Sequence, residues 1–265
     1  MDLVELRQIA EQVAVAAGAL LVDGRGAEPL ATDAKSSPTD VVTEMDRAAE
    51  QLITTGLLQL RPDDGLIGEE GTRRAGTTGV DWLVDPLDGT VNYLYGLGGW
   101  AVSVAALVGG ESVAGVVHVP NVGETFAAVR GGGATCNGHP LRLGPGPSLD
   151  QALVATGFGY AAARRANQAA VLQSVLPAVR DIRRFGACAV DLCLVATGRV
   201  DAYFERGVQP WDHAAGSLIA TEAGALFAGL CGRPPSDRFV LAAPPAVFGP
   251  LHDLLVAAGA DAEVD

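Results

Sequence analysis

The spacing of apolar residues changes twice along this 265-residue chain, and these changes limit the possible folds. Over residues 3–21, apolar side chains recur every three or four positions, which predicts an amphipathic helix that ends near Gly24. A second helix is predicted from Thr43 to just before Pro62, because Thr43 and Asp46 have the spacing of a capping box. The chain therefore opens with two helices.

The pattern then becomes that of β-strands. Short apolar or alternating runs are separated by Gly-Gly, Asn-Gly and proline, which are typical of turns. These runs are "GLIGEE", "VDWLVD", "WAVSVAALV", "SVAGVVHV", "TFAAVR" and "HPLRL". A mostly antiparallel sheet is the expected result.

After "LGPGPSL" the predicted elements alternate between strand and helix. They are the strand "ALVATG", helices over 167–180 and 187–197, the strand "VDAYFE", a helix over 212–224, the strand "RFVLAA" and the closing helix "AVFGPLHDLLVAAG". This order predicts an N-terminal α+β half, residues 1–145, joined to a C-terminal α/β half, residues 146–265. Because no linker or repeat separates the halves, we expect one compact layered unit with the active-site cleft between them.

Composition excludes several classes of protein. With 49% hydrophobic residues, the chain can bury a large core and is not mainly disordered. Its 18 basic and 31 acidic residues give a net charge of −13, which disfavours binding to nucleic acid or anionic membranes. An anionic substrate would therefore need a local cation. No apolar run reaches the ~18 residues of a membrane span, and the N-terminus does not resemble a signal peptide, so we expect a soluble cytoplasmic protein.

Cysteine and histidine spacing argues against a soft-metal site. The four cysteines lack C-x-x-C spacing and the four histidines are scattered, which disfavours zinc, structural disulfides and most transition-metal sites. We expect the cysteines to be reduced and mostly buried. Any bound metal should be held by oxygen atoms.

The heptapeptide "VDPLDGT" places two carboxylates, Asp85 and Asp88, at the end of an apolar run. Pro86 holds the preceding residue extended, and Gly89 permits a tight bend, so we expect the strand to end there with both carboxylates on one side. A polar surface turn explains the heptapeptide equally well.

Other acidic residues also lie at the ends of predicted elements. Glu69 follows a strand-like run in "LIGEEG", Asp212 begins a helix in "QPWDHAAG", and Asp46 lies with Lys35 and Asp40 around the second helix start. Each has an ordinary explanation as a solvated loop or a helix cap. Together with "VDPLDGT" they favour one shared site.

At this point the chain resembles the inositol monophosphatase family of magnesium-dependent, lithium-sensitive phosphatases. The resemblance covers nearly the whole chain through "KSSPTDVVTEMD", "IGEEG", "WLVDPLDGTVNY", "FGACAVDLCLVATGRVDAYFE" and "WDHAAGSLIATEAGA". The pair of motifs D-P-x-D-G-T and W-D-x-A-A-G makes it specific. It implies an αβαβα sandwich, a homodimer, and hydrolysis of myo-inositol 1-phosphate or a related polyol phosphate.

The resemblance also implies a set of metal ligands. Glu69, Asp85 and the Leu87 carbonyl would hold one Mg²⁺, and Asp85, Asp88 and Asp212 would hold a second that stabilises the departing alkoxide. Glu69 would also contact a weaker third ion, giving two to three ions per site. Since hydrolysis of phosphate monoesters needs up to ~10²¹-fold acceleration and a general base supplies only about 10²–10⁴, electrostatic stabilisation by metal must carry much of the remainder.

Catalytic and substrate-binding roles follow from the same resemblance. Thr90, paired with Asp46, would orient or deprotonate the attacking water beside Glu69, and Glu205 would accept hydrogen bonds from polyol hydroxyls. The implied substrate-binding residues are Glu69, Leu87, Asp88, Gly89, Thr90, Gly186, Ala187, Cys188, Glu205 and Asp212. A helix entry packed for its own sake explains residues 186–188 equally well.

Several alternatives remain at this stage. "CNGHPLR" has the C-x₅-R spacing of thiol phosphatases but contains an Asn-Gly turn and a proline, and "GFGYAA" is a weak dinucleotide-binding pattern. Related activities on histidinol phosphate, fructose 1,6-bisphosphate or a 3′-phosphonucleotide would use the same cleft. The non-enzyme alternative is a silent binding or regulatory protein.

Overall fold

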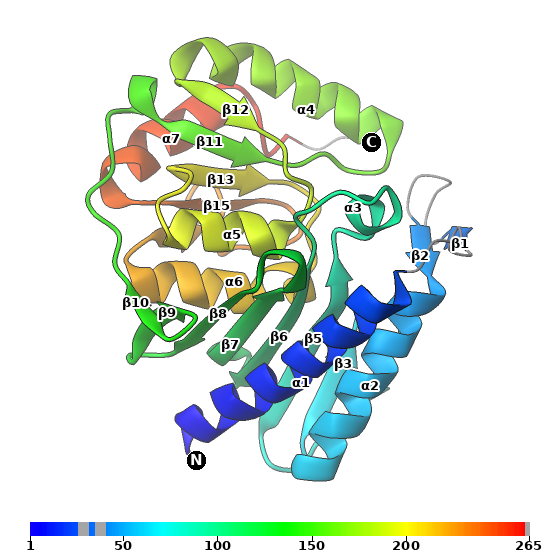
Figure 1. Ribbon diagram of the computed structural model, residues 1–265. Coiled ribbons are helices and arrows are strands. Elements are labelled where there is room, and N and C mark those ends of the chain that lie inside the picture. The colour runs from blue at the N-terminus through cyan, green and yellow to red at the C-terminus, as the bar shows by residue number, and fades with distance from the viewer. Residues whose placement is uncertain (26–31, 35–40, 263–265) are drawn as a thin grey trace.

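The computed structural model describes residues 1–25, 32–34 and 41–262, so the predicted positions Lys35 and Asp40 lie outside the described residues. Within this part of the chain, helices and sheets alternate in five layers (Figure 1), which confirms the predicted αβαβα sandwich. The layers are a helix pair, an eight-stranded sheet, a second helix pair, a five-stranded sheet and a third helix pair.

The first layer consists of α1 (Leu3–Gly24) and α2 (Glu44–Leu60), which confirms both predicted helices. Helix α1 packs on the strands β6 (Ala101–Val108) and β7 (Glu111–Val119), and α2 packs on β5 (Val80–Asp88), so together they cover one face of the large sheet. The predicted capping box is present at α2: the Thr43 hydroxyl oxygen accepts from the Asp46 amide, and the Asp46 carboxylate accepts from the Thr43 amide at 2.8 Å. A two-stranded ribbon of β1 (Thr32–Ala34) and β2 (Val41–Thr43) precedes this helix.

The large sheet has the strand order β10-β9-β8-β7-β6-β5-β3-β4. Its strands are β3 (Gly65–Gly68), β4 (Arg73–Arg74), β5 (Val80–Asp88), β6 (Ala101–Val108), β7 (Glu111–Val119), β8 (Glu124–Val129), β9 (Gly133–Cys136) and β10 (His139–Leu141). Among these described strands β3 and β5 run parallel and every other neighbouring pair is antiparallel, as predicted. The short strands β4 and β9 were not predicted, because neither shows an alternating apolar run.

Strand β5 is buried on both faces and carries the first acidic motif. Trp82 and Val84 pack toward α1 and α2, whereas Leu83 packs toward the middle helices, as the two-residue period of a strand requires. The prediction that the strand ends at Asp85 is wrong, because β5 continues to Asp88.

A bulge allows β5 to pass its proline. Asp85 pairs with Ser103 and Asp88 pairs with Ala101, so the segment around Pro86 contains one residue more than the β6 segment opposite. Proline donates no ladder hydrogen bond and is tolerated at such bulges. In a regular strand, residues three apart face opposite sides; the extra residue brings both carboxylates to the same side, as expected.

The middle layer consists of α5 (Cys188–Ala196) and α6 (Pro210–Ala223). The predicted start of α6 at Asp212 is two residues late. Pro210 occupies the first helical position and Gln209 is the N-cap, so Asp212 lies in the first turn and its carboxylate accepts from the Gln209 amide at 2.6 Å. One apolar cluster in this layer contains residues from both sheets and both helices.

The five-stranded sheet has the order β12-β11-β13-β15-β14 and is mixed, with β11 parallel to β12 and β13. Its strands are β11 (Leu153–Thr156), β12 (Asp181–Arg183), β13 (Ala202–Glu205), β14 (Leu226–Ala228) and β15 (Val240–Ala243). The outer helices are α4 (Ala162–Val175) and α7 (Pro245–Ala257). Helix α4 begins five residues before the predicted 167, because its N-cap Ala161 carries no capping side chain to mark the start in the sequence.

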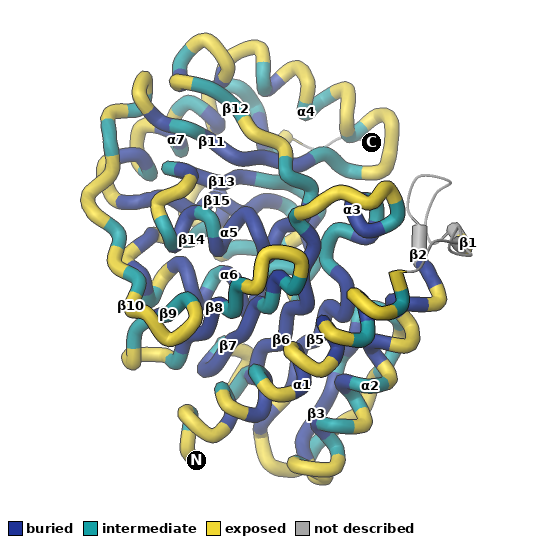
Figure 2. The backbone as a smooth tube through the Cα atoms, viewed as in Figure 1, coloured by how far each residue is buried: buried dark blue, intermediate teal, exposed yellow. Residues whose placement is uncertain are grey.

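Buried residues concentrate in the two sheets and the middle helices (Figure 2), while the outer surface of α4 is exposed. Cys188 and Cys193 are buried, Cys136 is half-buried and Cys231 is exposed, so the expectation of mostly buried cysteines holds for two of the four; all four are free. Among the described residues, no helix combines the length and the apolar character needed to span a bilayer. The division at residue 145 remains a prediction.

Candidate active site

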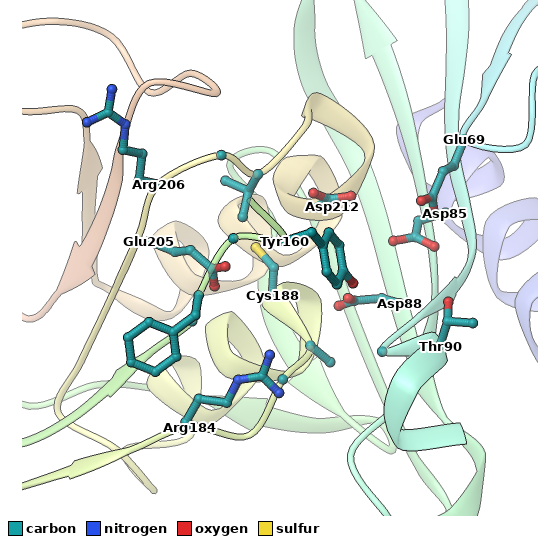
Figure 3. Close-up of a pocket in the computed structure, with 18 of the residues that line it drawn as sticks. Glu69, Asp85, Asp88, Thr90, Tyr160, Arg184, Cys188, Glu205, Arg206 and Asp212 are labelled. Carbon is teal, nitrogen blue, oxygen red and sulfur yellow. The ribbon is translucent and has the colours of Figure 1, made fainter. Parts of the chain in front are cut away.

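A pocket lies where the end of β5 meets the first turns of α5 and α6 (Figure 3). Almost every residue that the sequence assigned to the site lines it. These are Glu69, Asp85, Leu87, Asp88, Gly89, Thr90, Gly186, Ala187, Cys188, Glu205 and Asp212. Asp46 does not line the pocket but lies behind Thr90.

Three carboxylates from different elements converge on one side of this pocket. Glu69 follows β3, Asp85 belongs to β5 and Asp212 belongs to α6, and each offers an oxygen within 4.8 Å of the others. Burial raises the pKa of Asp85 well above its ordinary value, and the neighbouring negative charges raise it further; burial likewise raises the pKa of Asp212. Ionised carboxylates this close repel one another, and a bound cation would relieve that repulsion. A donor set made only of oxygen atoms suits Mg²⁺.

Asp88 lines the same pocket but lies outside that three-carboxylate set. Burial raises the pKa of Asp88 to about 8, although amides at the start of α5 lower it. Its Oδ2 accepts from the Ala189 amide at 2.6 Å, so this side chain joins the large sheet to the middle layer.

Thr90 and Asp46 form a buried hydrogen-bonded pair beside the carboxylates. Thr90 Oγ1 lies 2.9 Å from Asp46 Oδ1 and 3.1 Å from the Leu87 carbonyl oxygen, so its single proton can serve either acceptor. Asp46 Oδ2 accepts from the Thr43 amide at 2.8 Å and from the Thr43 hydroxyl at 2.5 Å. The capping interaction of α2 therefore fixes the carboxylate that faces Thr90.

Gly89 is required between Asp88 and Thr90 for two reasons. Its φ of 90° lies in the left-handed region that favours glycine. A Cβ at this position would also lie 3.1 Å from Ala187 Cβ and 3.1 Å from the Gly99 carbonyl oxygen. Glycine thus allows β5 to turn into the short helix α3 (Thr90–Leu94) while touching the start of α5.

Glu205 lies at the end of β13, on the side of the pocket away from Glu69 and Asp85 (Figure 3). Burial raises the pKa of Glu205 to about 7, while a hydrogen bond from Tyr203 and the charge of Arg184 lower it. The Tyr203 hydroxyl donates to Glu205 Oε2 at 2.8 Å. Sequence reasoning missed Tyr203, although its two-residue spacing from Glu205 places both on one face of a strand.

Comparison with known proteins gives the same assignment along the whole chain. The model of the inositol monophosphatase family matches residues 2–260. The inositol-1-monophosphatase SuhB of Mycobacterium tuberculosis is 47% identical over 239 residues, which cover 83% of this chain and 82% of that protein. The chain belongs to the inositol monophosphatase family.

Two further relatives show the range of names within this family. The Nus factor SuhB of Pasteurella multocida is 40% identical over 242 residues, covering 89% of this chain and 90% of that protein. The crystal structure of extragenic suppressor protein suhB from Bartonella henselae superposes with a TM-score of 0.90 at 34% identity, covering 95% of this chain and 98% of that chain. As a member of this metal-dependent family, the protein is a phosphatase, and its acidic cluster is a place where metal could bind.

A second buried acid supports the site of this phosphatase from behind. Glu50 of α2 accepts from the Glu70 amide at 2.7 Å, from the Thr72 amide at 3.0 Å and from the Thr72 hydroxyl at 2.6 Å. These bonds hold the turn that follows Glu69. Sequence reasoning missed Glu50, although an acid one turn after Asp46, on the buried face of an amphipathic helix, marks such a position.

The glycines of "GFGYAA", whose spacing resembles a dinucleotide-binding pattern, have another role in this structure. A Cβ at Gly157 would overlap the Glu205 carboxylate, and a Cβ at Gly159 would overlap the side chain of Arg164. Gln168 holds the loop by donating to the Gly157 carbonyl at 3.2 Å and accepting from the Gly159 amide at 2.9 Å. These glycines therefore make room for side chains of the phosphatase pocket.

Cys136 does not belong to the pocket. It ends β9, and Asn137 and Gly138, with φ of 48° and 77°, form the hairpin turn to β10. Burial raises the pKa of its thiol, which disfavours the reactive thiolate.

We expect Cys136→Ser to retain magnesium-dependent phosphate release within about twofold of the wild type, because the thiol is protonated and distant from the carboxylates. The comparison of kcat/KM for the two proteins checks this expectation. An inactive but folded Cys136→Ser protein would restore the thiol hypothesis.

Proposed function

We propose that this phosphatase hydrolyses the phosphate monoester of a polyol in a Mg²⁺-dependent reaction, with myo-inositol 1-phosphate as the leading substrate. The observation that carries the proposal is the convergence of Glu69, Asp85 and Asp212 oxygens within 4.8 Å, beside the Thr90–Asp46 pair. The names of relatives such as the M. tuberculosis inositol-1-monophosphatase support the choice of substrate.

The metal ligands we propose are those that the resemblance implies. One Mg²⁺ would be held by Glu69, Asp85 and the Leu87 carbonyl. A second would be held by Asp85, Asp88 and Asp212, and Glu69 would also contact a third. All of these residues line the pocket and offer oxygen, the donor that Mg²⁺ prefers. When bound, such ions lower the pKa of water and neutralise charge on phosphoryl oxygens.

The residues of the chain position and deprotonate the attacking water. A water that donates to Thr90 Oγ1 is oriented by a hydroxyl that itself donates to Asp46. As the water oxygen forms its bond to phosphorus, its proton passes to Thr90 Oγ1 and the Thr90 proton passes to Asp46. Glu69 accepts a hydrogen bond from the second hydrogen of that water, which stays on the oxygen that becomes part of the phosphate. The ester P–O bond breaks, and the departing polyol oxygen takes its proton from solvent.

Substrate contacts come from both sides of the pocket. The Gly89 and Thr90 amides, where α3 begins, offer donors to the phosphate. Glu205 accepts hydrogen bonds from polyol hydroxyls, and the backbone of residues 186–188 lines the same side. Tyr203 holds the Glu205 carboxylate in place.

A panel of substrates tests this proposal. Phosphate release is measured with and without Mg²⁺ from myo-inositol 1-phosphate, histidinol phosphate, fructose 1,6-bisphosphate and a 3′-phosphonucleotide. Among the singly phosphorylated compounds, we expect myo-inositol 1-phosphate to have the largest kcat/KM. If histidinol phosphate is turned over faster, Glu205 would instead be assigned to binding the ammonium group of histidinol. No release from any compound would favour the binding or regulatory alternative.

Three additional properties are proposed from family membership: inhibition by lithium, assembly as a homodimer, and location in the cytoplasm. The free state of all four cysteines suits a reducing compartment. Inhibition assays with LiCl and light scattering on the purified protein test the first two.

A further inference from the structure

Tyr160 lines the active-site pocket and still exposes 44% of its surface. Among the described residues, no other large apolar side chain that is exposed to this degree lines the pocket. Ligand sites commonly hold the apolar part of a ligand against such aromatic side chains, while a few polar groups fix its orientation. The exposed ring of Tyr160 is therefore a candidate contact for the substrate.

The ring lies between the two ends of the pocket. Figure 3 shows Tyr160 with Glu205 on one side and the carboxylates of Glu69 and Asp85 on the other, and all four residues line the same pocket. In the proposed function, the phosphate binds at the carboxylates and the hydroxyls bind at Glu205. The carbon skeleton of the polyol joins these two ends, so it passes Tyr160.

Helix α4 holds the backbone that carries this ring. Gln168 bonds to main-chain atoms of the preceding loop, as described above. Arg165 donates to the Gly159 carbonyl at 3.2 Å and to the Tyr160 carbonyl at 2.6 Å. Because the main chain is already fixed, less entropy is lost when the Tyr160 ring contacts a ligand.

The start of α4 does not explain an aromatic residue at this position. Tyr160 precedes the N-cap Ala161, and an apolar side chain there often packs on the fourth residue of the helix. In α4 that fourth residue is Arg165, a charged side chain that bonds to main-chain carbonyls. The usual apolar partner at a helix start is thus replaced by a cation.

The apolar core does not explain the ring either. Phe158, the other aromatic residue of the pocket, also lines a small second cavity with Phe204 and Phe239, which belong to the core of the five-stranded sheet. Tyr160 belongs to none of the apolar clusters of the described residues. Its ring therefore differs from that of Phe158 in facing the pocket without serving the core.

We infer that Tyr160 determines specificity by covering one face of the polyol ring of the substrate. This inference rests on the proposed function and assigns a residue to its substrate preference. The C–H groups on the face of a carbocycle pack on the face of the phenol ring, while the hydroxyls at its edge reach Glu205. Tyr160 contacts only the part of the substrate that does not react, so it strengthens binding and leaves the chemical step unchanged.

Two substrates of different shape test this role. Glycerol 2-phosphate is a short acyclic compound with the same phosphate monoester group as myo-inositol 1-phosphate. We expect Tyr160→Ala to lower kcat/KM for myo-inositol 1-phosphate by about tenfold, mainly through a higher KM, because a large apolar contact is lost. For glycerol 2-phosphate, kcat/KM should stay within about twofold of the wild type. An equal loss with both substrates would overturn the inference, because general damage to the pocket affects them alike.

Two further variants assign the effect to the ring of Tyr160. Tyr160→Phe keeps the aromatic face and should retain the wild-type ratio of the two kcat/KM values. If Tyr160→Phe lost as much as Tyr160→Ala, the hydroxyl would be responsible and the stacking role would be refuted. Tyr95→Ala is the matched control, because Tyr95 is exposed and lies outside the pocket. A drop in the ratio for Tyr95→Ala equal to that for Tyr160→Ala would also contradict the inference.

The same measurements separate failure of this inference from failure of the proposed function. If the wild type releases phosphate from myo-inositol 1-phosphate and Tyr160→Ala leaves the ratio unchanged, the role of Tyr160 alone is overturned. If the wild type releases phosphate from neither substrate, the proposed function is overturned. Calorimetry with myo-inositol 1-phosphate and Mg²⁺ then decides the contact: about tenfold weaker binding by Tyr160→Ala supports it, and equal binding refutes it.

Discussion

Replacing Asp88 with Asn should lower magnesium-dependent turnover by at least about a thousandfold while the protein remains folded. The asparagine oxygen can still accept from the Ala189 amide, so the link between β5 and α5 is kept. What is lost is a negative charge beside the carboxylate cluster, where we propose that Mg²⁺ binds. Phosphate-release kinetics and circular dichroism on the same preparation measure both parts of this result.

The same variant should make the stability of the metal-free protein less sensitive to pH. Burial raises the pKa of Asp88 from 3.8 to about 8, so between these values the folded protein binds more protons than the unfolded chain. Stability without metal therefore falls as pH rises through this window, and Asn, which does not ionise, removes that contribution. Urea unfolding at several pH values in EDTA checks the sign.

Asp81→Asn is the matched control for both measurements. It makes the same chemical change on the same strand, at an exposed position outside the pocket. Full activity in Asp88→Asn, or an equal loss in Asp81→Asn, would contradict the assignment of Asp88 to the metal site.

We expect magnesium to raise the melting temperature of the wild type by roughly 5–10 °C, and EDTA to reverse the rise. A ligand at a hundred times its dissociation constant adds about 2.7 kcal/mol to stability, and each kcal/mol shifts the melting temperature of a chain this long by about 2–4 °C. The physical cause is neutralisation of buried carboxylates whose pKa values burial and mutual repulsion raise. Thermal unfolding monitored over a MgCl₂ titration measures the shift.

Asp85→Asn should abolish most of this stabilisation, because both of the main metal positions that we propose share Asp85. Its amide oxygen can still accept from the Leu87 N–H, a bond of 3.1 Å in the wild type, so the bulge is preserved. The metal-free variant should be at least as stable as the metal-free wild type, since one buried charge has been removed. A wild type that does not respond to MgCl₂, or a variant that responds equally, would refute the proposed ligands.

Several elements could be predicted from the sequence because their causes are local. The opening helices follow from apolar spacing. The four-residue capping box from Thr43 to Asp46 marks where the second helix starts. The hairpin at Asn137 and Gly138 follows from the φ values that these residues tolerate. The start of α4 could not be found in the same way, because Ala161 has no polar side chain to indicate a cap.

The bulge in β5 shows where local reasoning fails. Pro86 suggested an end to the strand, but pairing with β6 continues on both sides of it. The energy of that pairing depends on a strand distant in sequence, so no window around the proline contains the information. The role of Glu50 was missed for the same reason, because it comes from a contact with Thr72, 22 residues away, that folding creates. Tyr203 is different: its partner Glu205 lies only two residues away on the same strand face, so the signal was local and was overlooked.

The sequence by itself determined the layered fold, the family, and the acidic and hydroxyl residues of the candidate site. These are properties of residue type, order and short-range spacing, which a chain displays before it folds. Only the tertiary structure brought Glu69, Asp85 and Asp212 within 4.8 Å and placed Asp46 behind Thr90. Distances between residues far apart in the chain depend on the packing of whole layers, and burial then sets their charges and their chemistry.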